Sequence, residues 1–208
     1  MCRPVLFPSY EGDVSWISKG EVVVATFRDG LNQERRRERL KTALLQEEWL
    51  GEVIRDANAQ LTKLRAGGHQ NAGGLIVAMT QGHAREVADL VKRVTGESAM
   101  VAVSEDPEAS RTIKAFAKSH ARWLVAVNMV SEGVDIPRLR VGVYATNVLT
   151  EMYFRQVVGR FVRMARTGGE DRSSYLYIPR DPVLVMQARK VKEERDHALV
   201  ERAQSERE

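Results

Sequence analysis

The chain has 208 residues, of which 43% are hydrophobic and 29% charged, so it is long enough to bury the core of one or two compact domains. Its single cysteine, Cys2, excludes an internal disulfide, and its four scattered histidines show no ligand spacing for a zinc site. The formal net charge of +4 is compatible with a polyanionic partner. No stretch resembles a membrane helix or a secretory signal, so we expect no membrane partner and a cytoplasmic location.

Residues 1–66 are predicted to form a connector of short strands followed by amphipathic helices. The β-branched runs at residues 5–10 and 21–27 predict strands, and polar turn residues separate them. From residue 32 to residue 65 the apolar side chains recur every three or four positions, as one or two amphipathic helices require. The basic run at residues 35–39 indicates either a solvated helix face or a nucleic-acid contact.

The glycine-rich segment 66–74 is the best candidate linker, because glycine continues a helix only at an entropic cost. After it, apolar strands alternate with short helices, which predicts an α/β fold: a parallel sheet with helices on both faces. We expect this domain to span residues 67–182, and the charge-dense residues 183–208 to form an exposed helix. The predicted strands are 75–79, 100–104, 123–128, 141–146 and 175–178, and the predicted helices are 81–94, 108–119 and 150–164.

Ligands of open parallel sheets bind beyond the carboxyl ends of the strands, which directs attention to the residues that follow each apolar run. Gln81 and His83 lie at the start of a predicted helix, where backbone N–H groups suit an anion; a simple helix cap is the alternative. In the loop SEGVDIP, residues 131–137, Gly133 lets the backbone approach a ligand and Asp135 can accept hydrogen bonds from ribose hydroxyls. Taken alone, this loop is equally an ordinary turn.

The segment QVVGRFVR, residues 156–163, falls within the predicted helix 150–164. There Gln156, Arg160 and Arg163 share one stripe, and apolar side chains cover the opposite side. Two guanidinium forks on one stripe suit a polyphosphate, although a solvated arginine face has the same pattern. Gly159 in mid-helix costs about 1 kcal/mol relative to Ala, which indicates that something approaches closely there.

In combination, SEGVDIP and QVVGRFVR, separated by one short strand, closely resemble motifs V and VI of the superfamily 2 helicases, the DEAD/DEAH-box class. LIVAMTQGHA, residues 75–84, is similar to the motif IV region, and residues 101–119 look like the next segment along the nucleic-acid path. The resemblance covers about residues 73–182 and implies the second, C-terminal RecA-like domain. The wording of residues 122–146 and 154–164 is similar to helicases of an actinobacterial or phage type.

The resemblance also implies a role for each matching residue. Arg160 and Arg163 would be arginine fingers that stabilise charge developing on the γ-phosphate of ATP, and Gln156 would position the phosphate or its water. Gly133 and Asp135 would contact the nucleotide sugar. Glu132 and Gly159 complete the expected nucleotide contacts. Contacts to the phosphate backbone of DNA or RNA, most suitably single-stranded, are expected from Ser104, Ser131, Thr146, Gln81 and His83.

The sequence departs from the helicase pattern in two elements that bind ATP and magnesium. It contains no G-x-x-x-x-G-K-[ST] phosphate loop and no Asp-Glu pair after an apolar strand. We therefore expect the C-terminal motor half of an ATP-dependent helicase or translocase, inactive as an ATPase alone. Its first RecA-like domain, holding the magnesium, would act in trans or have been lost by truncation. Two alternatives stay open: a non-catalytic nucleic-acid-binding or regulatory module that uses residues 35–39, and an unrelated nucleotide-binding fold.

Overall fold

A computed structural model describes residues 3–18, 21–103, 108–127, 135–162 and 171–205 of the chain, with side chains to residue 198. Among these residues, seven strands form one sheet, and neighbouring strands are parallel. The predicted α/β fold is confirmed. The sheet strands are β1 (Val5–Leu6), β2 (Ser9–Tyr10), β5 (Gly73–Ala78), β6 (Ala99–Ala102), β7 (Trp123–Val127), β8 (Leu139–Ala145) and β9 (Ser174–Pro179).

The strand order β1–β9–β8–β5–β7–β6 places β5 between β7 and β8, and β2 pairs with β9 beyond β1. Ala78, the last residue of β5, pairs with Val127 of β7 and Ala145 of β8, so these three strands end level with one another. We call this end of the sheet the carboxyl edge. The opposite end, where β5 and β8 begin at Gly73 and Leu139, is the amino edge.

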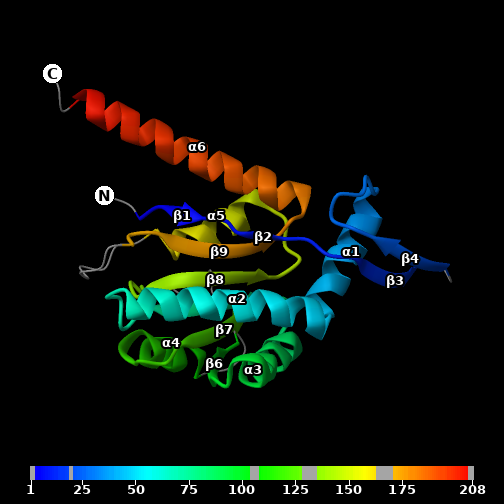
Figure 1. Ribbon diagram of the computed structural model, residues 1–208, viewed down its shortest axis with the longest axis horizontal. Coiled ribbons are helices and arrows are strands. Elements are labelled where there is room, and N and C mark those ends of the chain that lie inside the picture. Colours follow the sequence, from blue (N-terminus) through cyan, green and yellow to red (C-terminus); the bar gives the residue numbers. More distant parts are fainter. Residues whose placement is uncertain (1–2, 19–20, 104–107, 128–134, 163–170, 206–208) are drawn as a thin grey trace.

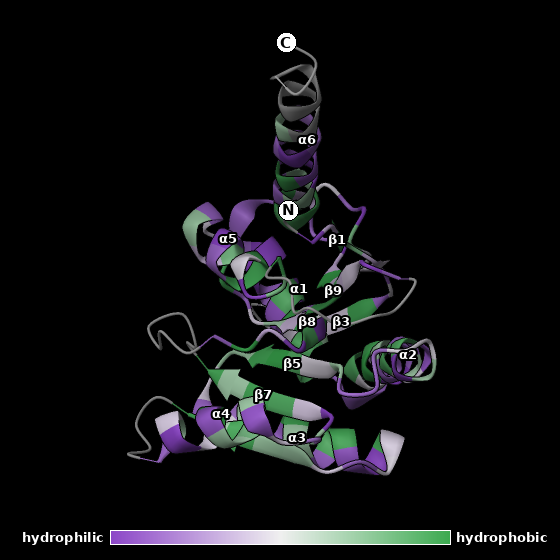
Figure 2. Ribbon diagram, turned by 90° about the vertical axis from the view of Figure 1, so that its left-hand side faces the viewer, coloured by the Kyte–Doolittle hydropathy of each residue, from purple (hydrophilic) through white to green (hydrophobic). Residues whose placement is uncertain are grey.

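Helices cover both faces of the sheet (Figures 1 and 2). Strand β7 shows why the apolar runs are continuous: Trp123, Val125 and Val127 enter one core, and the alternate residues Leu124 and Ala126 enter the other. The first core is closed by α2 (Glu47–Ala66) and α3 (Gln81–Thr95), and the second by α4 (Ala109–Lys118), α5 (Glu151–Gly159) and α6 (Pro182–Ser205).

Residues 1–66 are built into this domain, whereas the sequence analysis separates them as a connector. Strands β1 and β2 extend the sheet beside β9, and α2 packs on β8 and α3. The apolar stripe of α2 needs a partner surface, and that surface is the sheet itself. The glycine-rich segment after α2 is a tight turn that ends in Ala72, which is buried. Between β2 and α2, the chain forms an antiparallel hairpin of β3 (Val14–Ser18) and β4 (Glu21–Ala25), followed by α1 (Gln33–Leu45).

Helix α1 and the hairpin stand at the carboxyl edge of the sheet (Figure 1). Arg39 of α1 reaches Asp181, which follows β9, and the carbonyl of Leu44 meets His83 at the start of α3. Helix α1 therefore covers part of the edge where the sequence analysis expects ligands. In the described residues, no helix has the length and apolar character needed to cross a bilayer.

Candidate nucleotide and nucleic-acid sites

Arg3, at the amino edge, bonds to the described ends of the two segments that resemble motifs V and VI. Its backbone N–H donates to the carbonyl of Val162 at 2.8 Å. Its guanidinium donates to the carbonyls of Leu139 at 2.7 Å and Pro137 at 3.4 Å. Pro137 ends the SEGVDIP loop and Val162 lies two residues after Arg160, so one residue holds both segments, the first through its side chain and the second through its backbone N–H. Arg3 is not among the residues predicted above, because no local sequence pattern distinguishes it.

Phe161 anchors the chain immediately after Arg160. Its side chain is fully buried, and Ser174 Oγ donates to its carbonyl at 3.1 Å. The ring packs against β8 at Gly142, where a Cβ would lie 2.4 Å from Cζ of Phe161. Packing against the sheet, rather than helix geometry, thus sets the position of Arg160.

Helix α5 ends earlier than the sequence analysis predicts. It stops at Gly159, and Arg160 is the C-cap, whose N–H bonds to the carbonyl of Val157 at 3.0 Å. Gln156 is exposed and Arg160 half-buried, while Arg163 lies outside the described residues, so no helical stripe containing all three is described. A Cβ at Gly159 would meet nothing within 4 Å, so the expected close approach is not seen there; the glycine sits where the helix stops.

Some of the remaining predicted contacts lie within the described residues and others lie outside them. Asp135 is exposed at the start of the described part of the SEGVDIP loop. Glu132 and Gly133 lie outside the described residues, as do Ser104 and Ser131, which are predicted to contact nucleic acid.

A second site is a cavity of about 390 Å³ at the carboxyl edge, beside the N-terminus of α3. Thr80 caps this helix by accepting from the N–H of His83 at 3.2 Å. The first N–H groups of a helix have no intrahelical partner and favour an anion, and half-exposed Gln81 begins this turn. The cavity is lined by Lys41, Leu45, Met79, Thr80, Gly82, His83, Glu86 and Asn147.

His83 is placed to join two helices. Its ring is buried; Nδ1 accepts from the N–H of Met79 at 3.2 Å, so Nε2 carries the proton and donates to the carbonyl of Leu44 at 3.0 Å. Thr146 is also buried, with 1% of its surface exposed. The groups that line the cavity beside them include Lys41 and Asn147, which the sequence analysis missed; the signal for Asn147 is its place just beyond an apolar strand.

The stability of the protein is expected to fall on acidification partly through His83. Burial lowers the pKa of His83 below its ordinary value of 6.5, so the unfolded chain binds the proton more readily than the folded one. The free energy of unfolding should therefore be unaffected by this group above about pH 6.5 and should decrease as the pH falls below it. Urea denaturation at pH 7.5 and 5.5 should show a smaller loss for His83→Gln than for wild type. The control His120→Gln, at an exposed position, should keep the wild-type loss, and equal losses in all three would contradict the assignment.

The basic run at residues 35–39 is partly structural. Arg39 is fully buried, its guanidinium lies 4.8 Å over the ring of Phe27, and it donates to the carbonyl of Thr26. Arg36 donates to Asp181 at 3.2 Å. A solvated or nucleic-acid-binding role is therefore open only to the exposed Arg35 and Arg37, which removes much of the support for a binding module based on this run.

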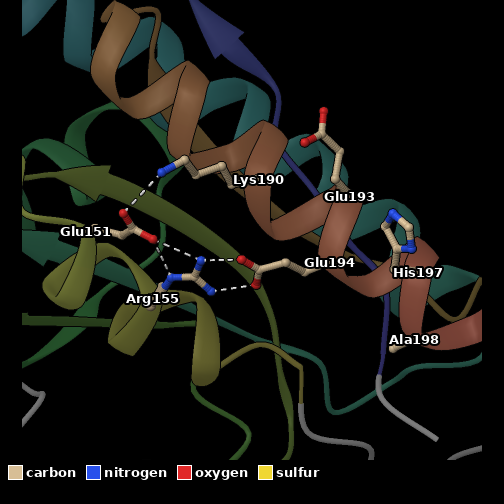
Figure 3. A pocket seen from close by; sticks show the side chains of 7 residues that line it. All are labelled: Glu151, Arg155, Lys190, Glu193, Glu194, His197 and Ala198. Atoms are coloured by element: carbon tan, nitrogen blue, oxygen red, sulfur yellow. Dashed lines mark hydrogen bonds and ion pairs between the residues drawn. The ribbon is translucent and has the colours of Figure 1, made fainter.

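A third cavity, of about 530 Å³, lies between α5 and α6 and is occupied by ion pairs (Figure 3). Arg155 bonds to Glu151 at 2.9 Å and to the two carboxylate oxygens of Glu194 at 2.5 and 2.7 Å, and Lys190 reaches Glu151 at 3.4 Å. The hydrogen bond from Arg155 lowers the pKa of Glu194. These contacts join α6 to α5, the helix that ends next to Arg160. Because the charged groups of Arg155, Lys190, Glu151 and Glu194 pair with one another, this cavity is not a candidate site for a charged ligand.

The fold defines a class: it is an α/β fold of the RecA-like type, which two solved structures share. Similar structures are a fragment of a putative HsdR subunit of a type I restriction enzyme from Vibrio vulnificus and Dbp5 of S. cerevisiae bound to RNA and ADP BeF3. The first has a TM-score of 0.54 and 17% identity, covering 88% of this chain and 33% of that one. The second has a TM-score of 0.52 and 15% identity, covering 70% and 37%. At these identities the likeness shows the fold alone.

Proteins similar in sequence come from mycobacteria. The uncharacterized protein Rv2917 of Mycobacterium tuberculosis is 43% identical over 200 residues, which are 95% of this chain and 32% of the relative. The uncharacterized protein ML1624 of Mycobacterium leprae is 42% identical over 95% of this chain and 33% of its own length. The chain thus spans about a third of the relatives that it matches. No protein-family model matches it.

Proposed function

We propose that the chain is the second motor domain of an ATP-dependent nucleic-acid helicase or translocase, of the actinobacterial or phage type. The observation that carries the proposal is the junction at Arg3, which holds the exit of the SEGVDIP loop against the chain that follows Arg160. These are the two segments that match motifs V and VI, and nothing in their local sequence requires them to meet.

Asp135 lies two residues before Pro137 and Arg160 two residues before Val162, and both side chains would suit the polar groups of a nucleotide. Asp135 would accept hydrogen bonds from the ribose, and the guanidinium of Arg160 would stabilise negative charge on the γ-phosphate. ATP supplies the phosphoryl group, and its magnesium would be held by a first RecA-like domain, because this sequence has neither the phosphate loop nor the Asp-Glu pair.

The cavity at the carboxyl edge would contact the backbone of single-stranded DNA or RNA. The N-terminus of α3 offers backbone N–H groups, Lys41 adds a positive charge and Asn147 an amide, while Glu86 limits the net charge. Such contacts position a strand without reading its bases. Dbp5, which shares this fold, is bound to RNA in its own structure, in keeping with this assignment.

Reconstitution tests the proposal. The chain alone should hydrolyse no ATP, whereas a mixture with a RecA-like domain that carries a phosphate loop should show turnover that single-stranded DNA or RNA stimulates. Turnover by the pure chain that disappears in Arg160→Ala would contradict the missing-half interpretation. Association of the two domains without turnover would favour a non-catalytic nucleic-acid-binding module.

A further inference from the structure

Three buried arginines line a cavity of about 490 Å³ at the amino edge, which shares Arg3 and Pro137 with the junction described above. Arg3 precedes β1, and Arg138 and Arg140 stand at the start of β8; they are 4%, 8% and 3% exposed. We call this cavity the arginine pocket. Its mouth is formed by exposed residues, among them Gln70 in the turn between α2 and β5.

Backbone carbonyl groups hold the arginines in place. Arg138 donates to the carbonyls of Phe116 and Asn71 at 3.1 and 3.0 Å, and its guanidinium lies 4.1 Å over the ring of Phe116. Arg140 donates to the carbonyls of Ser173 and Asp171 at 2.9 and 2.6 Å. The pocket is therefore a pre-formed arrangement of charged groups. Its charged groups are buried and fixed, unlike flexible arginine side chains on a protein surface.

The carboxylate of Asp171 partly offsets the charge of Arg140, but ion pairs close enough to count as salt bridges are not seen for the three arginines within the described residues. Burial, and then the nearby charges of Arg140 and Arg65 respectively, lower the pKa of Arg3 and of Arg138 to about 10. Burying three like charges is unfavourable when carbonyl dipoles and the single nearby charge of Asp171 offset them only in part, and an anion in the cavity would relieve that cost.

In the part of the chain that the structure describes, Arg140 also has an N–H group available to a ligand in the arginine pocket. A guanidinium has five N–H groups, and the bonds of Arg140 within the described residues engage Nε and Nη2 but not Nη1. Gly73 makes room for Arg138, since a Cβ there would lie 2.7 Å from Nη1 of that arginine. Planar forks of this kind match the oxygens of a phosphate group.

We propose that the arginine pocket binds a phosphate group, either free or carried by a nucleotide or by the end of a nucleic-acid strand. The proposal does not rest on the helicase function, because Asp135 and Arg160 do not line the pocket. Arg3 links the two places: its guanidinium, which would contact the phosphate, donates to the carbonyl of Pro137, and its backbone N–H donates to the carbonyl of Val162.

Isothermal titration calorimetry and thermal melting of the whole chain with inorganic phosphate test the pocket, with chloride at equal ionic strength as the reference. Phosphate should produce saturable heat and raise the melting temperature, because a ligand that binds only the folded state stabilises it. Gln70→Glu should weaken phosphate affinity about threefold and Gln70→Lys should strengthen it by a similar factor, because each places a charge at the mouth. Neither change touches the buried bonds. Arg140→Gln should weaken affinity about tenfold, whereas Arg111→Gln, at an 80% exposed side chain on α4, should not.

The source of the phosphate follows from parallel titrations with ATP and with a 5′-phosphorylated single-stranded oligonucleotide. The source is the ligand that binds most tightly and whose affinity changes in the same direction as that of inorganic phosphate in the two Gln70 variants. Absence of phosphate binding at millimolar concentration would overturn the proposal. Equal affinity of wild type, both Gln70 variants and Arg140→Gln would overturn it as well.

Discussion

Arg160→Ala should lower ATP turnover by about a thousandfold or more when this chain is combined with a phosphate-loop domain, as is typical when an arginine finger is absent. Arg160 is held at the end of α5 by the burial of Phe161 against β8, so its guanidinium is delivered by a rigid element. Steady-state hydrolysis at saturating ATP and saturating single-stranded nucleic acid measures the effect.

The control for this experiment is Arg111→Ala, which removes the same charge from an exposed position on α4 and should leave turnover unchanged. Arg160→Lys separates charge from geometry, because lysine keeps the charge but not the planar fork; it should recover only a small part of the lost rate. Wild-type turnover in Arg160→Ala, together with nucleic-acid stimulation, would show that another group stabilises the γ-phosphate.

Asp181→Ala should lower the free energy of unfolding by about 3–5 kcal/mol, the usual cost of removing one partner of a buried ion pair. Asp181 and Arg39 both have fully buried side chains, with Oδ2 3.7 Å from Nη2 of Arg39. Its other oxygen accepts from Arg36 at 3.2 Å and from the N–H of Val183, in the first turn of α6, at 2.9 Å. The substitution leaves a buried guanidinium without its carboxylate and also removes a contact at the helix start.

Urea denaturation of Asp181→Ala and of the exposed control Asp89→Ala measures the difference, and the control should change stability by less than about 0.5 kcal/mol. The double variant Arg39→Met with Asp181→Ala should recover part of the loss, because it removes the unpaired charge as well. A loss in Asp181→Ala no larger than in the control would show that the pair is not buried in solution.

The strands of the sheet and most of the helices that cover it could be predicted from the sequence. The run at residues 123–128 predicts a strand buried on both faces, and β7 is one, because a parallel sheet covered by helices buries every side chain of a central strand. Helix α3 begins at Gln81, as expected, since Thr80 is a strong N-cap. Helix α5 is shorter than expected, because the apolar pattern continues through Phe161 although that side chain packs on β8 from non-helical backbone.

The site residues could be predicted only in part. His83 follows an apolar strand, as a ligand-binding residue would, but its ring bonds to a helix 39 residues earlier in the chain. The run at residues 35–39 reads as a uniform basic face, yet it is divided between exposed arginines and a buried one. Periodicity reports which side of a helix is apolar, and it carries no information on which charged group will meet a distant carboxylate.

The sequence by itself determined the element types, the parallel sheet and the two segments that resemble helicase motifs, because these depend on local periodicity and on residue spacing along the chain. Tertiary structure alone decided that β1 and β2 join the sheet, that α2 packs on it and that α1 covers part of its carboxyl edge. It also decided that Arg3 reaches Leu139, 136 residues away, and lines a pocket with two other arginines. Contacts across such separations are set by how whole elements pack, and no local pattern of residues encodes them.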